Sequence, residues 1–404
     1  MRMPKSQHGF TLLELMIASF IGVLVVLAIS SLFKTGMDVS LAITQRAETQ
    51  ANMRAAIEFM SKDISQAGAG LPNGGGLQLV SGGTKSFYAC DQTGVCYVVN
   101  HSYPNSGAGV ANFMYGIIPG PNNGVQNGAV ITNAAGLPDA SITLAYCDTS
   151  FPLDNFTWTF QNANGSSVGV GLIAVPDTTK PLDIGQAGGL NQGDIILFTT
   201  IGAPVPNAPN SDASAVNKAV AAGEITNGPV VSNASGLAFV AGDPLNFNQT
   251  LNSTGSLTQA SGTAAQLAGG AGKPVPSKNI AVCRLNVVTY FLQVPAAGGT
   301  VQTPRLMRQV NGLKPMPVAD NIINLQITYD LIDSQTGYLA ANLADPIGAL
   351  QSPSLIQKVN IWIMGESISS HGNKSQSMYL ATSVAARDMS FCNSYSNSST
   401  ACGN

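Results

Sequence analysis

Charged side chains are scarce in this chain, because 18 Lys and Arg and 21 Asp and Glu make up only 10% of its 404 residues, against roughly 25% in an ordinary soluble domain. The basic residues form no cluster, so we expect no nucleic-acid partner. Histidine occurs only three times, at His8, His101 and His371, without Cys or acid neighbours at metal-ligand spacing. We therefore expect no His-based catalysis, no metal site and no cofactor.

Cysteine is also sparse, with six residues in the whole chain. Six cysteines are too few for a disulfide scaffold of this length, but they suffice for three disulfides in an oxidising compartment. The polar residues are mainly Gly, Asn, Ser, Thr and Gln, and the formal net charge is −3. This composition predicts a protein that works outside the cytoplasm.

Catalytic motifs are absent or incomplete. Gly165–Gly169 has the spacing of a nucleophile elbow, but β-like residues follow it where a helix would be needed, so we expect a hairpin turn. Gly272-Lys273 lacks the first glycine and the hydroxyl residue of a phosphate-binding loop. Asp330–Gly337 has oxygen ligands for Ca²⁺ but not the spacing or the bidentate Glu of an EF-hand, which favours an Asp-rich turn between strands. We expect no enzyme.

A long apolar segment lies near the amino terminus. Leu15–Phe33 contains 19 residues without a charge, enough for about 28 Å of helix and therefore for the hydrocarbon core of a bilayer. Arg2 and Lys5 precede it and favour a cytoplasmic amino terminus with the remaining chain on the opposite side. A cleaved secretory signal is disfavoured, because its apolar region is shorter and is followed by small residues at the cleavage site.

The residues at the start of this segment resemble the type III signal of type IV prepilins: Gly9-Phe10-Thr11-Leu12-Leu13-Glu14 follows a short basic leader. The resemblance implies that a prepilin peptidase cleaves between Gly9 and Phe10 and that the new amino terminus of Phe10 is methylated. It also implies that the helix stays in the membrane until assembly extracts it.

Glu14 lies one helical turn after Phe10, so its carboxylate can reach the amino end of its own helix or of a neighbouring one. An unpaired carboxylate in an apolar bundle is costly, and the ammonium group of a neighbour would offset that cost. We therefore expect Glu14 to dock the incoming subunit. The alternative is a simple cap that interacts with the helix dipole.

The helix is expected to continue beyond the membrane to Gln66. Apolar residues recur there with helical spacing and predict a face that packs on a sheet: Met53, Ile57, Met60 and Ile64. Helix-breaking residues follow: Gly68, Gly70 and Pro72.

Short strands are expected after the helix, with residues 202–278 forming a Gly-, Ala-, Asn- and Ser-rich insertion that buries little. The candidate strands are a hairpin over Phe87–Val99, then Ser141–Cys147, Phe156–Phe160, Val168–Val175, Asp194–Thr200, Gly236–Val240 within the insertion, Ile280–Val294, Arg305–Val310, Ile322–Leu331, Val359–Met364 and Tyr379–Phe391. Alternation in the later strands is typical of a half-buried antiparallel sheet.

The last third of the chain resembles PilW-type minor pilins and the related J-type pseudopilins, through Tyr290 ahead of Leu306–Arg308, then Val318–Tyr329 and Val359–Ile363. The predicted fold class is α+β, with a pilin-like amino-terminal helix packed on an antiparallel head that carries a large β and loop insertion. The expected regions are a leader (1–9), the transmembrane and assembly helix (10–66), the first part of the head (67–201), the insertion (202–278) and a PilW-like sheet region (279–404).

The six cysteines allow 15 pairings. Cys90 and Cys96 flank a predicted turn at a separation that suits a disulfide. Cys392 and Cys402 resemble the small carboxy-terminal disulfide loop of pilin heads. By exclusion, the third guessed pair is Cys147–Cys283.

The resemblance implies a minor pilin that acts in pilus assembly initiation or at the pilus tip. Its partners would be other major and minor pilins, the prepilin peptidase and the assembly platform. It would lie in the inner membrane with a periplasmic head and later on the cell surface. Two alternatives remain open: a minor pseudopilin of type II secretion, and a tip adhesin that binds a surface receptor.

Overall fold

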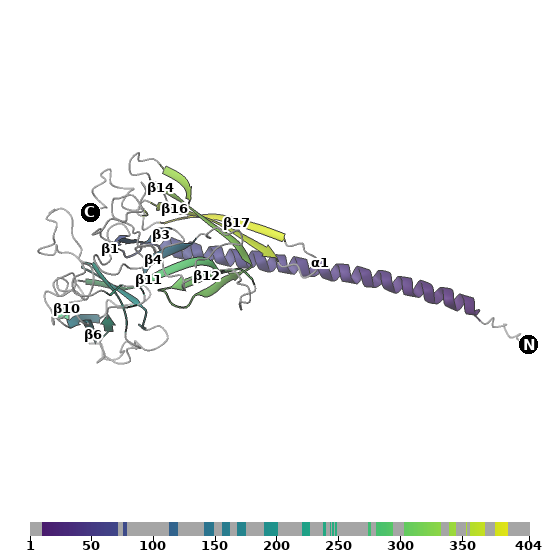
Figure 1. Cartoon of the computed structure of the whole chain (residues 1–404), viewed down its shortest axis with the longest axis horizontal. Helices are drawn as coiled ribbons and strands as arrows, with labels where there is room; N and C mark the ends of the chain where they lie inside the picture. The colour runs from purple at the N-terminus through teal and green to yellow at the C-terminus, as the bar shows by residue number, and fades with distance from the viewer. Residues whose placement is uncertain are drawn as a thin grey trace, which may run out of the picture.

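The computed structural model consists of one long helix and a head of antiparallel sheets (Figure 1). It describes residues 10–71, 76–78, 113–119, 141–148, 156–161, 168–174, 190–200, 220–226, 237–239, 243, 245, 247–248, 274–275, 280–293, 303–332, 339–344, 353, 356–367 and 376–386. The α+β prediction is therefore confirmed.

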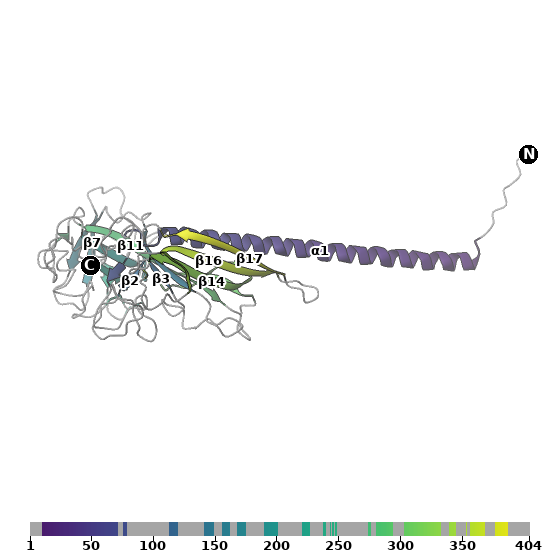
Figure 2. The same cartoon turned by 90° about the horizontal axis from the view of Figure 1, so that it is seen from above.

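The helix α1 (Leu12–Gln66) has 55 residues and is about 83 Å long. Its amino-terminal part projects from the head as a bare rod, and its carboxy-terminal part lies among the sheets (Figures 1 and 2). The first buried residue is Thr49. Of the four apolar residues predicted to face a sheet, Met53, Met60 and Ile64 are fully buried and Ile57 is half-buried.

The central sheet has seven strands. Five of them follow in the order β13 (Met316–Asp320), β12 (Arg305–Val310), β11 (Ile280–Gln293), β4 (Ile142–Asp148) and β3 (Ile117–Pro119). The other two are β7 (Ile195–Thr200), which pairs with β11, and β8 (Val220–Glu224), which pairs with β7. The 14-residue strand β11 organises this sheet, because its first half pairs with β7, its last half with β12 and its middle with β4.

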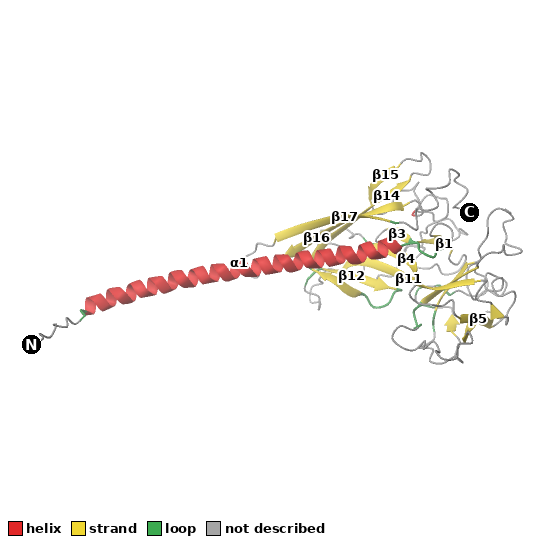
Figure 3. Ribbon diagram, turned by 180° about the vertical axis from the view of Figure 1, so that it is seen from behind, coloured by secondary structure: helices red, strands yellow, loops and turns green. Residues whose placement is uncertain are grey.

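A second sheet covers another side of α1 and has the order β15 (Leu339–Ala344), β14 (Ile322–Ile332), β16 (Ile356–Ser367) and β17 (Gln376–Ala385). Figure 3 shows these two sheets on either side of the carboxy-terminal part of α1. Two smaller sheets pair β1 (Gly76–Gln78) with β2 (Phe113–Tyr115), and β10 (Pro274–Val275), β5 (Phe156–Gln161), β6 (Val168–Ala174) and β9 (Leu237–Phe239) in this order.

Close packing brings α1 directly onto β16. A Cβ atom added to Gly365 would lie 2.9 Å from both Met53 Sδ and Thr49 Cγ2. The residues of β16 on the same side, Ile361 and Ile363, are buried as their alternation predicted. In β14, where the register shifts between Ile322 and Asn324, Ile322 is fully buried, whereas Ile323, which alternates with Leu325 and Ile327 in the sequence, is half-buried.

The expectation that the insertion buries little is wrong for the part that the structure describes. Strand β8 pairs with β7, and the insertion residues Asp243, Leu245, Phe247 and Asn248 are buried. Leu245 packs on Gly312, where an added Cβ would lie 2.6 Å from Leu245 Cδ2. Val220–Glu224 is rich in Ala and Gly, which have low strand propensity. This segment therefore forms a strand because it pairs with β7, and not because of its own sequence pattern.

The sequence did not predict six other short strands: β1, β2, β3, β10, β13 and β15. Strand β13 contains Pro317, which is tolerated because β13 is an edge strand of its sheet. The expected hairpin over Phe87–Val99 lies outside the described residues, as do the three histidines.

Candidate functional site

The amino terminus of α1 carries Glu14, which the sequence analysis predicted to dock a neighbouring subunit or to cap the helix. Thr11 is the N-cap and forms a capping box with Glu14. The Thr11 backbone N–H donates to Glu14 Oε2 over 3.0 Å, the Thr11 hydroxyl donates to the same oxygen over 3.1 Å, and the Glu14 N–H donates to Thr11 Oγ1 over 3.3 Å. These reciprocal bonds satisfy two amide donors that a helix start leaves without partners.

Glu14 therefore caps its own helix, which is the simpler of its two predicted roles; the other is docking of a neighbouring subunit. The capping geometry holds the carboxylate within one turn of Phe10, whose side chain is 87% exposed. Gly9 lies outside the described residues. Any contact between Glu14 and the amine that cleavage would create therefore requires this carboxylate to exchange or share its bonds with Thr11.

The exposed part of α1 is long and apolar enough to cross a membrane, and none of its most apolar window is buried inside the protein. Large apolar side chains from Phe10 to Phe33 are at least half exposed on every side of the helix. A helix that is apolar all round requires a non-aqueous surrounding. This part of the chain is consistent with membrane anchoring.

A second polar site joins α1 to the head. The buried Asp63 carboxylate accepts hydrogen bonds from the hydroxyls of Tyr146 on β4, over 2.9 Å, and Tyr290 on β11, over 2.6 Å. Arg308 Nε on β12 donates to Asp63 Oδ2 over 2.8 Å. We call these four residues the anchor cluster, since they connect the helix to three successive strands of the central sheet.

The electrostatics of the anchor cluster keep each group in its bonding form. Burial, followed by the negative charge of Asp63 and its hydrogen bonds, raises the pKa of Tyr146 and Tyr290. The phenols therefore remain donors. Burial opposes the charge of Arg308, but the hydrogen bond and charge of Asp63 outweigh it and raise the Arg308 pKa.

Sequence reasoning missed this cluster. Tyr290 and Arg308 were noticed only for a family resemblance, and Asp63 was not singled out. One signal was available, because Asp63 lies between Met60 and Ile64 on the apolar face of the helix. An acid on a packed face requires a buried partner, but the sequence does not say which residue supplies it.

The chain leaves α1 through a turn that packs against the start of the head. Gly68 N–H donates to Ala145 O over 2.9 Å, and Cys147 N–H donates to Ala69 O over 2.8 Å. Gly70 has a φ of +72°, and a Cβ there would lie 2.6 Å from Cys147 Cβ, so only glycine fits.

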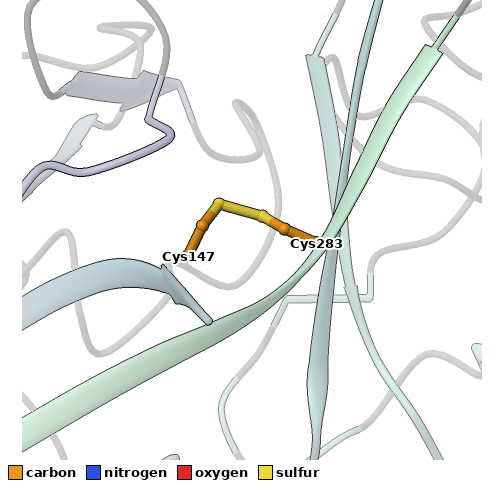
Figure 4. The surroundings of a disulfide bond; sticks show 2 residues. All are labelled: Cys147 and Cys283. Carbon is orange, nitrogen blue, oxygen red and sulfur yellow. A yellow bond between two sulfur atoms is a disulfide. The ribbon is translucent and has the colours of Figure 1, made fainter. Parts of the chain in front are cut away.

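A disulfide lies beneath this turn and joins Cys147 of β4 to Cys283 of β11 (Figure 4). This is the pair that was guessed by exclusion. The other two expected pairs, Cys90–Cys96 and Cys392–Cys402, lie outside the described residues.

The structure describes the motifs that resembled catalytic or metal sites only in part, and Gly272-Lys273 lies outside the described residues. Gly169 is part of β6 and pairs with the antiparallel strand β5, whereas a nucleophile elbow joins a strand to a helix. Asp330 is part of β14, and residues 333–337 lie outside the described ranges. Within the described ranges, no three His, Cys, Asp or Glu side chains are grouped so as to hold a metal ion.

Comparison with known protein families identifies one match, to the prokaryotic N-terminal methylation motif, over residues 4–32. No significant match to a curated protein or to a solved structure was found. The motif covers Gly9, Phe10 and Glu14 and marks a type IV pilin-like or pseudopilin signal. Such a signal indicates a structural, prepilin-type protein that is processed by a peptidase and assembles with other pilins.

Proposed function

We propose that this protein is a PilW-type minor pilin of a type IV pilus, cleaved between Gly9 and Phe10 and methylated on the Phe10 amine. The observation that carries the proposal is the methylation motif at residues 4–32, which runs without interruption into a 55-residue helix. The head leaves the first half of that helix uncovered.

Before assembly, the uncovered part of α1 holds the protein in the inner membrane. The basic leader keeps the amino terminus in the cytoplasm, and the head lies in the periplasm, where Cys147 and Cys283 can be oxidised. Other pilins, the prepilin peptidase and the assembly platform are the partners of this stage. During assembly the helix leaves the lipid for the apolar interior of a filament.

Glu14 guides this transfer. In the isolated protein its carboxylate is bonded to Thr11. In a bundle of apolar helices, the ammonium group at Phe10 of a neighbouring subunit supplies an opposite charge, whose attraction to the carboxylate is stronger in that low-dielectric surrounding than in water. The subunit is thereby placed at a defined height along the filament.

The head supports a position at the tip or in the initiating complex. Four sheets gather at one end of α1, and the two larger ones lie on different sides of its carboxy-terminal part (Figures 1 and 3). A head of this bulk is difficult to repeat along a filament, whereas a terminal subunit leaves one side of the head free.

Mass spectrometry of the mature amino terminus tests the processing step. We expect a chain that begins with methylated Phe10 in cells with prepilin peptidase, and the full leader in cells without it. A mature chain that begins elsewhere contradicts the proposal.

A Glu14→Gln variant tests the assembly step. We expect it to be cleaved normally but to be lost from sheared filaments, because a neutral amide cannot pair with the neighbouring ammonium. Glu58→Gln is the matched control, since Glu58 is an exposed acid farther along the same helix. Normal incorporation of the Glu14 variant contradicts the docking role. Loss of protein secretion with intact pili, after deletion of the chain, would instead favour the pseudopilin alternative.

A further inference from the structure

The sheet formed by β15, β14, β16 and β17 has an outer face that points away from α1. One side of β16 is buried through Ile361, Ile363 and Gly365, and Gly365 touches the helix. Alternate residues of the same strands therefore point to the other side. That side carries an open groove of about 550 Å³, whose outward-pointing lining residues include Gln326, Thr328, Asn342, Asn360, Trp362 and Ser383.

The groove is lined without any ionisable side chain. Its polar groups are amides and hydroxyls, which both donate and accept hydrogen bonds, and its largest side chain is the indole of Trp362. No lining side chain could offset the lost hydration of a charged ligand, and the nearby Asp330 carboxylate already accepts hydrogen bonds from Asn342 and Asn360. The lining therefore favours a neutral ligand with many hydroxyl groups and at least one apolar face.

The amides are held in place by a buried acid. Asp330, 9% exposed, accepts hydrogen bonds on Oδ1 from the Asn342 backbone N–H over 2.8 Å and from Asn360 Nδ2 over 2.9 Å. Ser383 donates its hydroxyl to Asn360 Oδ1, and Thr328 Oγ1 donates to Asn342 Oδ1 over 3.4 Å. The polar groups are thus oriented before any ligand arrives, which lowers the entropic cost of binding.

Asn342 reaches this position through an unusual backbone. Its φ is +55°, in the left-handed region that Asn tolerates better than most residues. It lies where the register between β14 and β15 shifts, between Tyr329 and Leu331. Such irregularities redirect a side chain and are common next to binding sites.

Trp362 is fixed by a second aromatic residue. Its ring stacks on Tyr379 of β17, with 6.2 Å between ring centroids and 25° between planes. Opposite Trp362 across the β16–β17 pair lies Ala381, whose small side chain leaves room for a ligand beside the indole. Aromatic planes pack on the C–H faces of sugar rings, while amides bind their hydroxyls.

We infer that this groove binds a neutral saccharide chain. The inference deepens the proposed function and rests on it only for its setting, in which a displayed head meets surface polysaccharides. Binding itself depends on the sheet and not on the processing of the amino terminus, so the two proposals fail separately.

The test uses the full-length chain in detergent micelles and three neutral probes: cellohexaose, maltohexaose and chitohexaose. In a Trp158→Phe background Trp362 is the only tryptophan, because the chain has two. We expect its emission to change saturably with at least one probe. By calorimetry, Trp362→Ala should weaken binding about tenfold or more, as expected for loss of an aromatic contact, and Trp362→Phe should retain most of it.

Met364→Ala is the matched control, because Met364 lies on the same strand and the same face but does not line the groove. It should bind as the unaltered chain does, and circular dichroism should show that every variant is folded. The inference is overturned if none of the three probes binds, if Trp362→Ala binds as tightly as the unaltered chain, or if negatively charged polygalacturonate binds as well as the neutral probes.

Discussion

Replacing Asp63 by Asn should weaken the attachment of α1 to the head, because it leaves the Arg308 guanidinium without a charged partner. The Asp63 side chain is 6% exposed and that of Arg308 is 28% exposed. An amide of the same shape can still accept a hydrogen bond from Tyr146 or Tyr290. The substitution therefore isolates the charge of the anchor cluster from its shape.

Breaking a buried ion pair by removing one partner costs about 3–5 kcal/mol. We expect about 3 kcal/mol for Asp63→Asn, since the part-exposed Arg308 regains some hydration. Asp63→Ala should cost about 1–2 kcal/mol more, because both phenols then lose their acceptor. An Asp63→Asn, Arg308→Met double variant should be more stable than Asp63→Asn alone, since no unpaired buried charge remains.

The assay is denaturant unfolding of the full-length chain in micelles, combined with hydrogen exchange of peptides from the last third of α1. Asp320→Asn is the control, because the Arg305–Asp320 pair has a similar 2.7 Å contact but is 36% and 52% exposed. Exposed pairs contribute about 0–1 kcal/mol. If Asp63→Asn and Asp320→Asn destabilise equally, or if exchange in α1 is unchanged, the anchor cluster does not hold the helix.

Three further substitutions test the packing of the head. Gly365→Ala places a methyl group 2.9 Å from Met53 Sδ and should lower the free energy of unfolding by about 1–3 kcal/mol. Gly22→Ala is the control, because an added methyl group there has nothing within 4 Å. Equal melting temperatures of the two variants would contradict this prediction. Burial and a neighbouring acid raise the pKa of Glu224 to about 8 from 4.5. The free energy of unfolding should therefore fall as pH rises from about 4.5 to 8, by at most about 1.4 kcal/mol per pH unit. Glu224→Gln should flatten that pH dependence in thermal melts, and an unchanged slope would refute the raised pKa. Cys147→Ser should lower the free energy of unfolding by about 2–5 kcal/mol, measured with denaturant. Reduction of the unaltered chain should cause the same loss. If only reduction causes a loss, another disulfide is responsible for the effect.

The helix was predictable because its information is local. Thr11 and Glu14 have the spacing of a capping box, and Gly68 follows the C-cap residue Ala67. Hydrogen bonds within three residues connect Thr11 to Glu14 and the Ala67 N–H to Ile64 O. The predicted end at Gln66 is confirmed for the same reason.

The candidate sites were only partly predictable. Gly9, Phe10 and Glu14 lie within one short motif that can be seen in the sequence alone, and their processing and docking roles stay predictions. The anchor cluster joins Asp63 to Arg308 across 245 residues, and the groove joins Asn342 to Ser383 through Asn360. Contacts of this kind depend on which distant strands pair, and local spacing in the sequence does not specify those partners.

The sequence by itself determined the amino-terminal signal, the apolar helix and the antiparallel character of the later strands, because each is encoded by spacing within a few residues. Only the tertiary structure decided that β8 and Leu245 of the insertion belong to the core, that Asp63 bonds the helix to three strands, and that Asn342, with its left-handed backbone, lines the same groove as Trp362. These features arise where distant segments meet, and burial there gives a polar or small residue a role that its own neighbourhood in the chain does not reveal.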